Sequence, residues 1–148
     1  ALLSVLQGGP GTHNADRFEA MKTQCSRIYE GVDQLDESDK IFKCGAGLNS
    51  CFIDSSGSFR LCSSLVNENC VYDLTKGSLK DAWENLVPRV HALTSDHVPY
   101  LENCAGCRLR DFCMWCPARC DLETGRLDAF IPSFCRITHK RYETCISS

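Results

Sequence analysis

Cysteine content constrains this chain more than any other feature of its sequence. The chain has 12 cysteines in 148 residues, and seven of them lie between residues 103 and 148. A proportion of about 8% is at the edge of the range of short disulfide-rich chains. Packing alone does not require so dense a group of thiols. Metal ligation, disulfides or redox chemistry must account for it, and the spacing of the cysteines discriminates among these.

The rest of the composition is ordinary for one globular domain. Hydrophobic residues make up 43% of the chain and charged residues 24%, with a formal net charge of -3. No apolar run approaches the roughly 20 residues of a membrane span, and nothing indicates a basic surface for nucleic acid. We therefore expect a cytoplasmic protein with one core and with neither a membrane nor a nucleic acid as partner.

The N-terminal part of the chain predicts a helix. Apolar residues recur at intervals of three and four from Phe18 to Val32, with Asn14 as a possible N-cap. Cys25 lies on this apolar face and is expected to be a small buried residue rather than a ligand.

A β-hairpin is expected further along the chain. Residues 52–53 and 59–61 are short strand candidates, and the turn-forming residues 54–57 separate them. Such a hairpin would bring Cys51 and Cys62 to the same end.

An amphipathic helix is predicted after the hairpin. Ser78 and Asp81 resemble a capping box, Trp83 is expected to pack in the core, and Pro88 should end or kink the helix. The predicted fold class is α+β: a small cysteine-rich domain with a short hairpin and peripheral helices, organised around two metal clusters.

The densest group of cysteines has the spacing of a local ligand set. Its members follow one another at gaps of two, five, two and three residues: Cys104, Cys107, Cys113, Cys116 and Cys120. A gap of two allows both sulfurs to reach one metal or cluster from a single turn. Three local thiolates with a distant fourth commonly hold iron–sulfur clusters, and Cys135 is available as the fourth.

Zinc sites, redox dithiols and disulfide frameworks account for this spacing less economically. Paired cysteines in structural zinc sites are usually separated by a dozen or more residues, whereas here the separation is five. A redox dithiol needs only one pair and leaves ten cysteines without a role. A disulfide framework would need a distant partner for each thiol of the closely spaced pairs. Zinc remains the main alternative metal.

The cysteine pattern as a whole resembles the SPASM domain, the C-terminal extension of many radical S-adenosylmethionine enzymes that modify peptides and proteins. The pattern begins with Cys44-x12-Gly57-x4-Cys62, continues through the dense group and ends at Cys135, so that it covers about two thirds of the chain. The stretches 72–83 and 113–118 are also similar to sequence found around those ligands. The resemblance implies two auxiliary [4Fe–4S] clusters.

The resemblance also assigns ligands to each cluster. Four cysteines would hold the second auxiliary cluster: Cys104, Cys107, Cys113 and Cys135. Four others would hold the first: Cys44, Cys51, Cys62 and Cys116.

Two of these assignments have alternatives. The family has a gap of three residues where Cys113 and Cys116 are separated by two, so Cys120 is an alternative to Cys116. Cys51 is preferred as the fourth ligand of the first cluster because of its place on the hairpin, with Cys70 or an open iron site as alternatives.

Positive charge lies beside the assigned ligands. Burying two anionic clusters calls for nearby donors and cations. The neighbouring cations are either ordinary surface residues or residues that tune the clusters: Lys43, Arg108, Arg110, Arg119 and Arg136.

The chain lacks the Cys-x3-Cys-x2-Cys motif with which radical S-adenosylmethionine enzymes bind their catalytic cluster. We therefore expect a C-terminal fragment that is not catalytic alone: residues 1–42 as the end of the catalytic barrel or a bridging helix, and residues 43–148 as the auxiliary-cluster domain. S-adenosylmethionine would bind only in the missing catalytic domain. The expected partners are that domain, in the same chain, and a peptide or protein substrate. The expected role is electron transfer or substrate docking, and the alternative is a cysteine-rich binding module with structural zinc.

Overall fold

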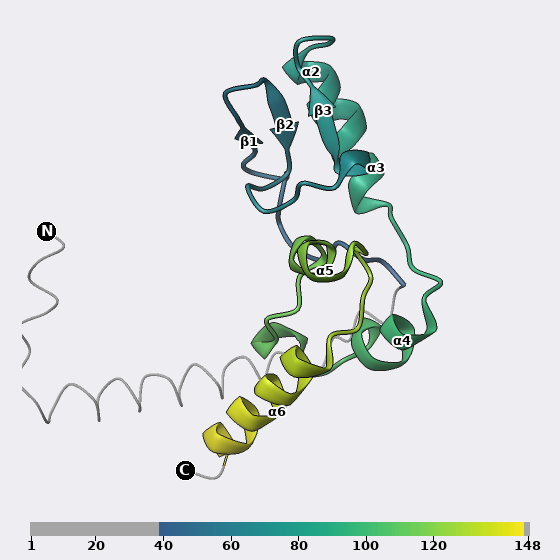
Figure 1. Ribbon diagram of the computed structural model, residues 1–148, viewed down its shortest axis with the longest axis vertical. Coiled ribbons are helices and arrows are strands. Elements are labelled where there is room, and N and C mark those ends of the chain that lie inside the picture. Colours follow the sequence, from purple (N-terminus) through teal and green to yellow (C-terminus); the bar gives the residue numbers. More distant parts are fainter. Residues whose placement is uncertain (1–38, 147–148) are drawn as a thin grey trace, which may run out of the picture.

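The computed structural model describes residues 39–146 (Figure 1). The helix predicted from Phe18 to Val32, with Cys25, lies outside these residues, as does nearly all of the segment 1–42. The described elements follow in this order: β1 (Phe52–Ile53), β2 (Ser58–Arg60), the 3₁₀ turn η3 (Glu68–Cys70), β3 (Val71–Asp73), α2 (Leu79–Asp81), the π turn η4 (Ala82–Leu86), α3 (Val87–His91), α4 (Val98–Tyr100), the π turn η5 (Leu101–Ala105), the 3₁₀ turn η6 (Arg110–Phe112), α5 (Pro117–Thr124) and α6 (Pro132–Ile146).

The predicted hairpin is confirmed. β1 and β2 pair antiparallel, with Ile53 opposite Phe59. The Asp54 carboxylate accepts bonds from the backbone N–H groups of Ser56 and Ser58, and Gly57 takes the positive φ of 85° that the turn requires. A third strand, β3, which was not predicted, pairs antiparallel with β2.

The predicted helix forms, but Pro88 does not end it. Ser78 caps the helix by accepting a bond of 3.1 Å from the Asp81 N–H, as expected. The chain then continues through η4 into α3 and reaches His91. Pro88 has no N–H to donate to Glu84 and its ring crowds that carbonyl. The chain responds by widening the preceding turn, in which the Val87 N–H bonds to the Ala82 carbonyl.

The main core lies between the sheet and this helix. The largest apolar side chains that are fully buried in it come from β2, the segment that follows it and α3: Phe59, Leu61, Leu65 and Val90. Trp83 packs against this core, with its ring edge-on to Phe59 at 6.2 Å, as predicted. We call elements β1 to α3 the sheet half of the structure.

A second group of elements, α4, η5, η6 and α6, forms what we call the pocket half, which lies below the sheet half in Figure 1. An antiparallel bridge between Lys40 and Thr94 and a bond of 2.7 Å from the Tyr100 hydroxyl to the Lys40 carbonyl tie the start of the described chain to this half. α5 lies between the halves, and its Ala118 packs into the main core.

The structure confirms a small α+β arrangement with an antiparallel three-stranded sheet. Within residues 39–146, no helix combines the length and the apolar character that crossing a membrane requires.

Candidate metal centre

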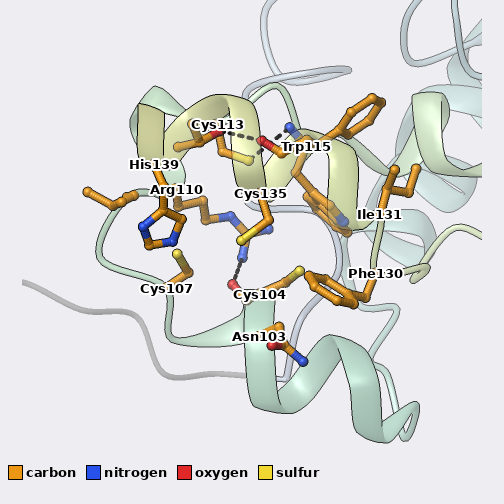
Figure 2. Close-up of a pocket in the computed structure, with 13 residues that line it drawn as sticks. Asn103, Cys104, Cys107, Arg110, Cys113, Trp115, Phe130, Ile131, Cys135 and His139 are labelled. Atoms are coloured by element: carbon orange, nitrogen blue, oxygen red, sulfur yellow. Dashed lines mark hydrogen bonds between the residues drawn. The ribbon is translucent and has the colours of Figure 1, made fainter. Parts of the chain in front are cut away.

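One pocket in the pocket half is lined by four cysteines, all of them predicted ligands of the same cluster (Figure 2): Cys104, Cys107, Cys113 and Cys135. They come from η5, from the two ends of the segment that contains η6, and from α6. The space between the lining side chains measures about 420 Å³, including the part that is open to solvent.

The local backbone accounts for three of these cysteines facing the same space. Backbone bonds run from Cys107 to Cys104, from Arg110 to Cys107 and from Cys113 to Arg110 at 2.9 to 3.3 Å. Each bond joins residues three apart, and in turns of this kind side chains three apart lie over one another. The spacing therefore places Cys104, Cys107 and Cys113 on one side of the segment, with Arg110 among them.

α6 supplies the fourth cysteine from the opposite wall. The ring of Tyr142 on α6 packs edge-on against Phe112 of η6, with centroids 6.2 Å apart. This contact holds α6 along η6, so that Cys135, near the start of α6, borders the pocket.

The remaining pocket walls are largely apolar, with Leu109, Trp115, Phe130, Ile131 and Phe134. They also include the polar residues Asn103, Arg110, Thr138 and His139. A hydrophobic shell of this kind limits the access of water to a metal site and lowers the local dielectric.

The structure alone does not identify the metal. Within residues 39–146, no group of three or more cysteine, histidine, aspartate or glutamate side chains is placed to hold a metal ion. A [4Fe–4S] cluster is bound through four different iron atoms, whereas a structural zinc ion takes all four ligands itself. The choice between these two metals stays a prediction from the sequence pattern.

The thiols of this pocket influence one another. Burial raises the pKa of Cys104 to about 12, and the neighbouring thiols of Cys107 and Cys113 contribute to that rise. Burial and the same two neighbours also raise the pKa of Cys135. Without a cation the Cys104 and Cys135 thiols stay protonated near neutral pH, and a bound metal centre would deprotonate them and release protons.

Trp115 fixes one edge of the pocket. Its backbone N–H donates to the Cys113 Sγ at 3.4 Å, and its indole Nε1 donates to the Ala129 carbonyl at 2.9 Å. Hydrogen bonds to ligating sulfurs are among the factors that set cluster potentials. The sequence did not predict this bond.

The other predicted ligand set lies around the end of the hairpin. The register of β1 and β2 brings Cys51 and Cys62 to the same end, as predicted. The Cys44 loop reaches this region because Gly47 lies directly against the Leu61 side chain, where an added Cβ would come within 2.6 Å.

Cys116 directly precedes α5, and both Cys116 and Cys62 are half-buried against the main core. Cys44 and Cys51 are exposed. Joint ligation of one cluster by these four cysteines stays a prediction.

The two alternative ligands occupy different surroundings. Cys70 is fully buried in the main core, and burial and the nearby Asp121 carboxylate raise its pKa to about 11. Cys120 is also fully buried, and burial raises its pKa to about 11, with Cys116 and Cys113 among the neighbours that contribute to the shift. The spacing of the cysteines did not predict that Cys120 lies close to both ligand sets. Its position four residues after Cys116, on one helix face, was the available signal.

The five cations beside the assigned ligands differ in their exposure to solvent. Arg108, Arg119 and Arg136 are exposed, whereas Lys43 and Arg110 are half-buried and donate to the carbonyls of Ala105 and Cys104. Ten cysteines of the described part are free thiols: Cys44, Cys51, Cys62, Cys70, Cys104, Cys107, Cys113, Cys116, Cys120 and Cys135.

Comparison of the chain with protein-family models, with curated proteins and with solved structures gives no match.

Proposed function

We propose that this chain is the auxiliary iron–sulfur domain of a radical S-adenosylmethionine enzyme that modifies a peptide or protein. In this proposal it binds two [4Fe–4S] clusters, which supply one-electron transfer, substrate docking or both. The domain is not catalytic alone, since S-adenosylmethionine is cleaved in a catalytic domain that carries the Cys-x3-Cys-x2-Cys motif.

One observation carries the proposal. Four cysteines that the sequence pattern assigns to the second cluster line the same pocket, although one of them is separated from the other three by more than twenty residues: Cys104, Cys107, Cys113 and Cys135. The assignment depends on spacing and resemblance alone, so their meeting in space is independent support.

The surroundings of this pocket also favour an electron-transfer group. Its walls are largely apolar, the Trp115 N–H donates to the Cys113 sulfur, and Arg110 contributes a positive charge. Reduction adds negative charge to a cluster, and such donors and charges make a buried anion tolerable.

The second set is proposed on weaker grounds. Cys44, Cys51 and Cys62 gather at one end of the hairpin, and Cys116 reaches the same core from α5. We prefer Cys51 over Cys70 because Cys51 lies beside Cys62 at the end of the hairpin, whereas Cys70 is fully buried in the main core.

The deciding experiment measures iron, acid-labile sulfide and zinc per chain on protein made and purified without oxygen. About eight iron and eight sulfide support two [4Fe–4S] clusters, and about four of each support only the pocket that the structure shows. About one or two zinc with no sulfide, even after attempted reconstitution, would make this a structural zinc module and remove the electron-transfer role.

A further inference from the structure

We infer that Arg110 sets the redox potential of the cluster held by Cys104, Cys107, Cys113 and Cys135. This inference rests on the proposed function and adds to it a residue that is not a ligand. Arg110 lines the same pocket as the four cysteines, and Figure 2 shows its guanidinium among them.

The position of Arg110 follows from the turn that orders the ligands. The residues at 104, 107, 110 and 113 are spaced by three, and backbone bonds join each to the next. Three of these positions are cysteines and the remaining one is Arg110. The turn that aims the thiols at the pocket therefore aims this cation at it as well.

Several contacts hold the guanidinium in place. Nη1 donates to the Tyr100 hydroxyl and to the Cys104 carbonyl, and Nη2 donates to the Ile41 carbonyl, each at 3.4 Å. The guanidinium carbon lies 4.9 Å from the centre of the Trp115 ring. Each hydrogen bond is long, but together with the stacking they fix a planar cation that remains charged at all relevant pH values.

The other cations near the ligands lack this combination. Arg108 follows a ligand directly in the sequence but is exposed, so solvent and salt screen its charge. Lys43 is half-buried and donates to the Ala105 carbonyl, one residue past Cys104. Among the described residues that line the pocket, only Arg110 is a lysine or an arginine.

The direction of the effect follows from charge. A four-thiolate [4Fe–4S] cluster carries about two negative charges when oxidised and about one more when reduced. A fixed cation nearby stabilises the reduced form more than the oxidised form and so raises the potential. In a partly buried site this charge corresponds to about a tenfold change in the ratio of oxidised to reduced cluster, or about 59 mV for one electron.

The test is an oxygen-free redox titration followed by electron paramagnetic resonance on wild type, Arg110→Gln, Arg110→Lys and Arg108→Gln, each with its iron and sulfide content. We expect Arg110→Gln to lower the potential of one cluster by about 59 mV and to leave the other in place. Arg110→Lys should restore most of the difference because it keeps the charge. Arg108→Gln removes the same charge from an exposed neighbour and should change neither potential by more than about a third of that amount.

The inference fails if Arg110→Gln keeps a full cluster at the wild-type potential, if Arg108→Gln shifts it equally, or if Arg110→Lys behaves like Arg110→Gln. Loss of iron from Arg110→Gln is also informative. In that case, if Arg110→Lys keeps its iron and its potential, the positive charge is what matters. If both variants lose iron, Arg110 acts only as a structural hydrogen-bond donor, and the inference is overturned. A wild-type protein that binds no cluster would instead overturn the proposed function itself.

Discussion

Lys43 donates a hydrogen bond from its Nζ to the carbonyl oxygen of Ala105 at 3.0 Å, across 62 residues of sequence. Each of these residues is the neighbour of a predicted ligand, Cys44 in one ligand set and Cys104 in the other. A charged donor on a half-buried carbonyl is stronger than a neutral pair. This bond therefore ties the two predicted metal centres through the protein itself.

Replacing Lys43 tests this tie. Lys43→Met keeps the aliphatic length but leaves the Ala105 carbonyl without this donor, and we expect it to lower the free energy of unfolding by about 1 to 2 kcal/mol. Lys43→Arg is the matched control, because it keeps a charged donor and should recover most of the loss. Urea unfolding of the cluster-loaded protein measures both variants. An unchanged urea midpoint in Lys43→Met would show that the bond contributes nothing.

Single alanine substitutions test the two-cluster assignment. Cys107→Ala should remove about half of the iron and sulfide, and Cys62→Ala should remove the other half, because each residue belongs to a different ligand set. Cys70→Ala is the control, since Cys70 lies in the main core and is expected to leave the iron content unchanged. The assignment is wrong if either ligand variant keeps the full iron complement.

The choice between Cys116 and Cys120 calls for its own comparison. Both lie on one face at the start of α5, where the Cys120 N–H donates to the Cys116 carbonyl at 2.9 Å. We expect Cys116→Ala to lose about half of the iron, and Cys120→Ala to keep all of it while losing stability through the small cavity it leaves. The reverse pattern in iron analysis would assign Cys120 as the ligand.

Cys70 predicts a pH dependence of stability. Burial, with the nearby Asp121 carboxylate, raises its pKa from an ordinary 9.0 to about 11, so the folded protein holds this proton more tightly than the unfolded chain. The stabilisation is fully present below pH 9 and is lost as the pH rises from 9 toward 11.

Urea unfolding of cluster-loaded wild type and Cys70→Ala measures this contribution as a difference. The variant should be less stable by about 1 kcal/mol near pH 8, and the gap should close or reverse by about pH 10.5. A gap of the same size at both pH values would contradict the raised pKa. Effects of pH on the clusters are common to both proteins and cancel in the comparison.

Local signals in the sequence were sufficient for the hairpin and for one helix start. Asp54 and Gly57 provide turn chemistry that acts over a few residues, and Ser78 caps the next helix within one turn. The strand Val71–Asp73 was missed because it has three residues, and its pairing with β2 depends on tertiary structure.

Pro88 shows how a correct local rule can leave an element boundary undecided, because the rule allows either an end or a kink at this residue. Pro88 lacks an N–H to donate within the helix. The sequence alone does not show that a π turn before Pro88 lets the helix continue without that bond. In the candidate site, the spacing pattern identified four cysteines that line one pocket. The selection of Arg110 from five nearby cations required the turn geometry, and the bond between Lys43 and Ala105 joins residues too distant for any local signal.

The place of α5 in the chain has a consequence for how such a domain could be divided. Cys116 precedes α5 and packs on the core formed by the sheet half, yet it lies in the sequence between Cys113 and Cys135, which border the other half's pocket. The sheet half is therefore completed by α5, which follows the first elements of the pocket half in the chain. The pocket half is in turn completed by α6, which follows α5. No single break in the chain separates the two halves into two complete pieces. We therefore expect the domain to unfold as one unit, and to be transferable to another protein only as a whole.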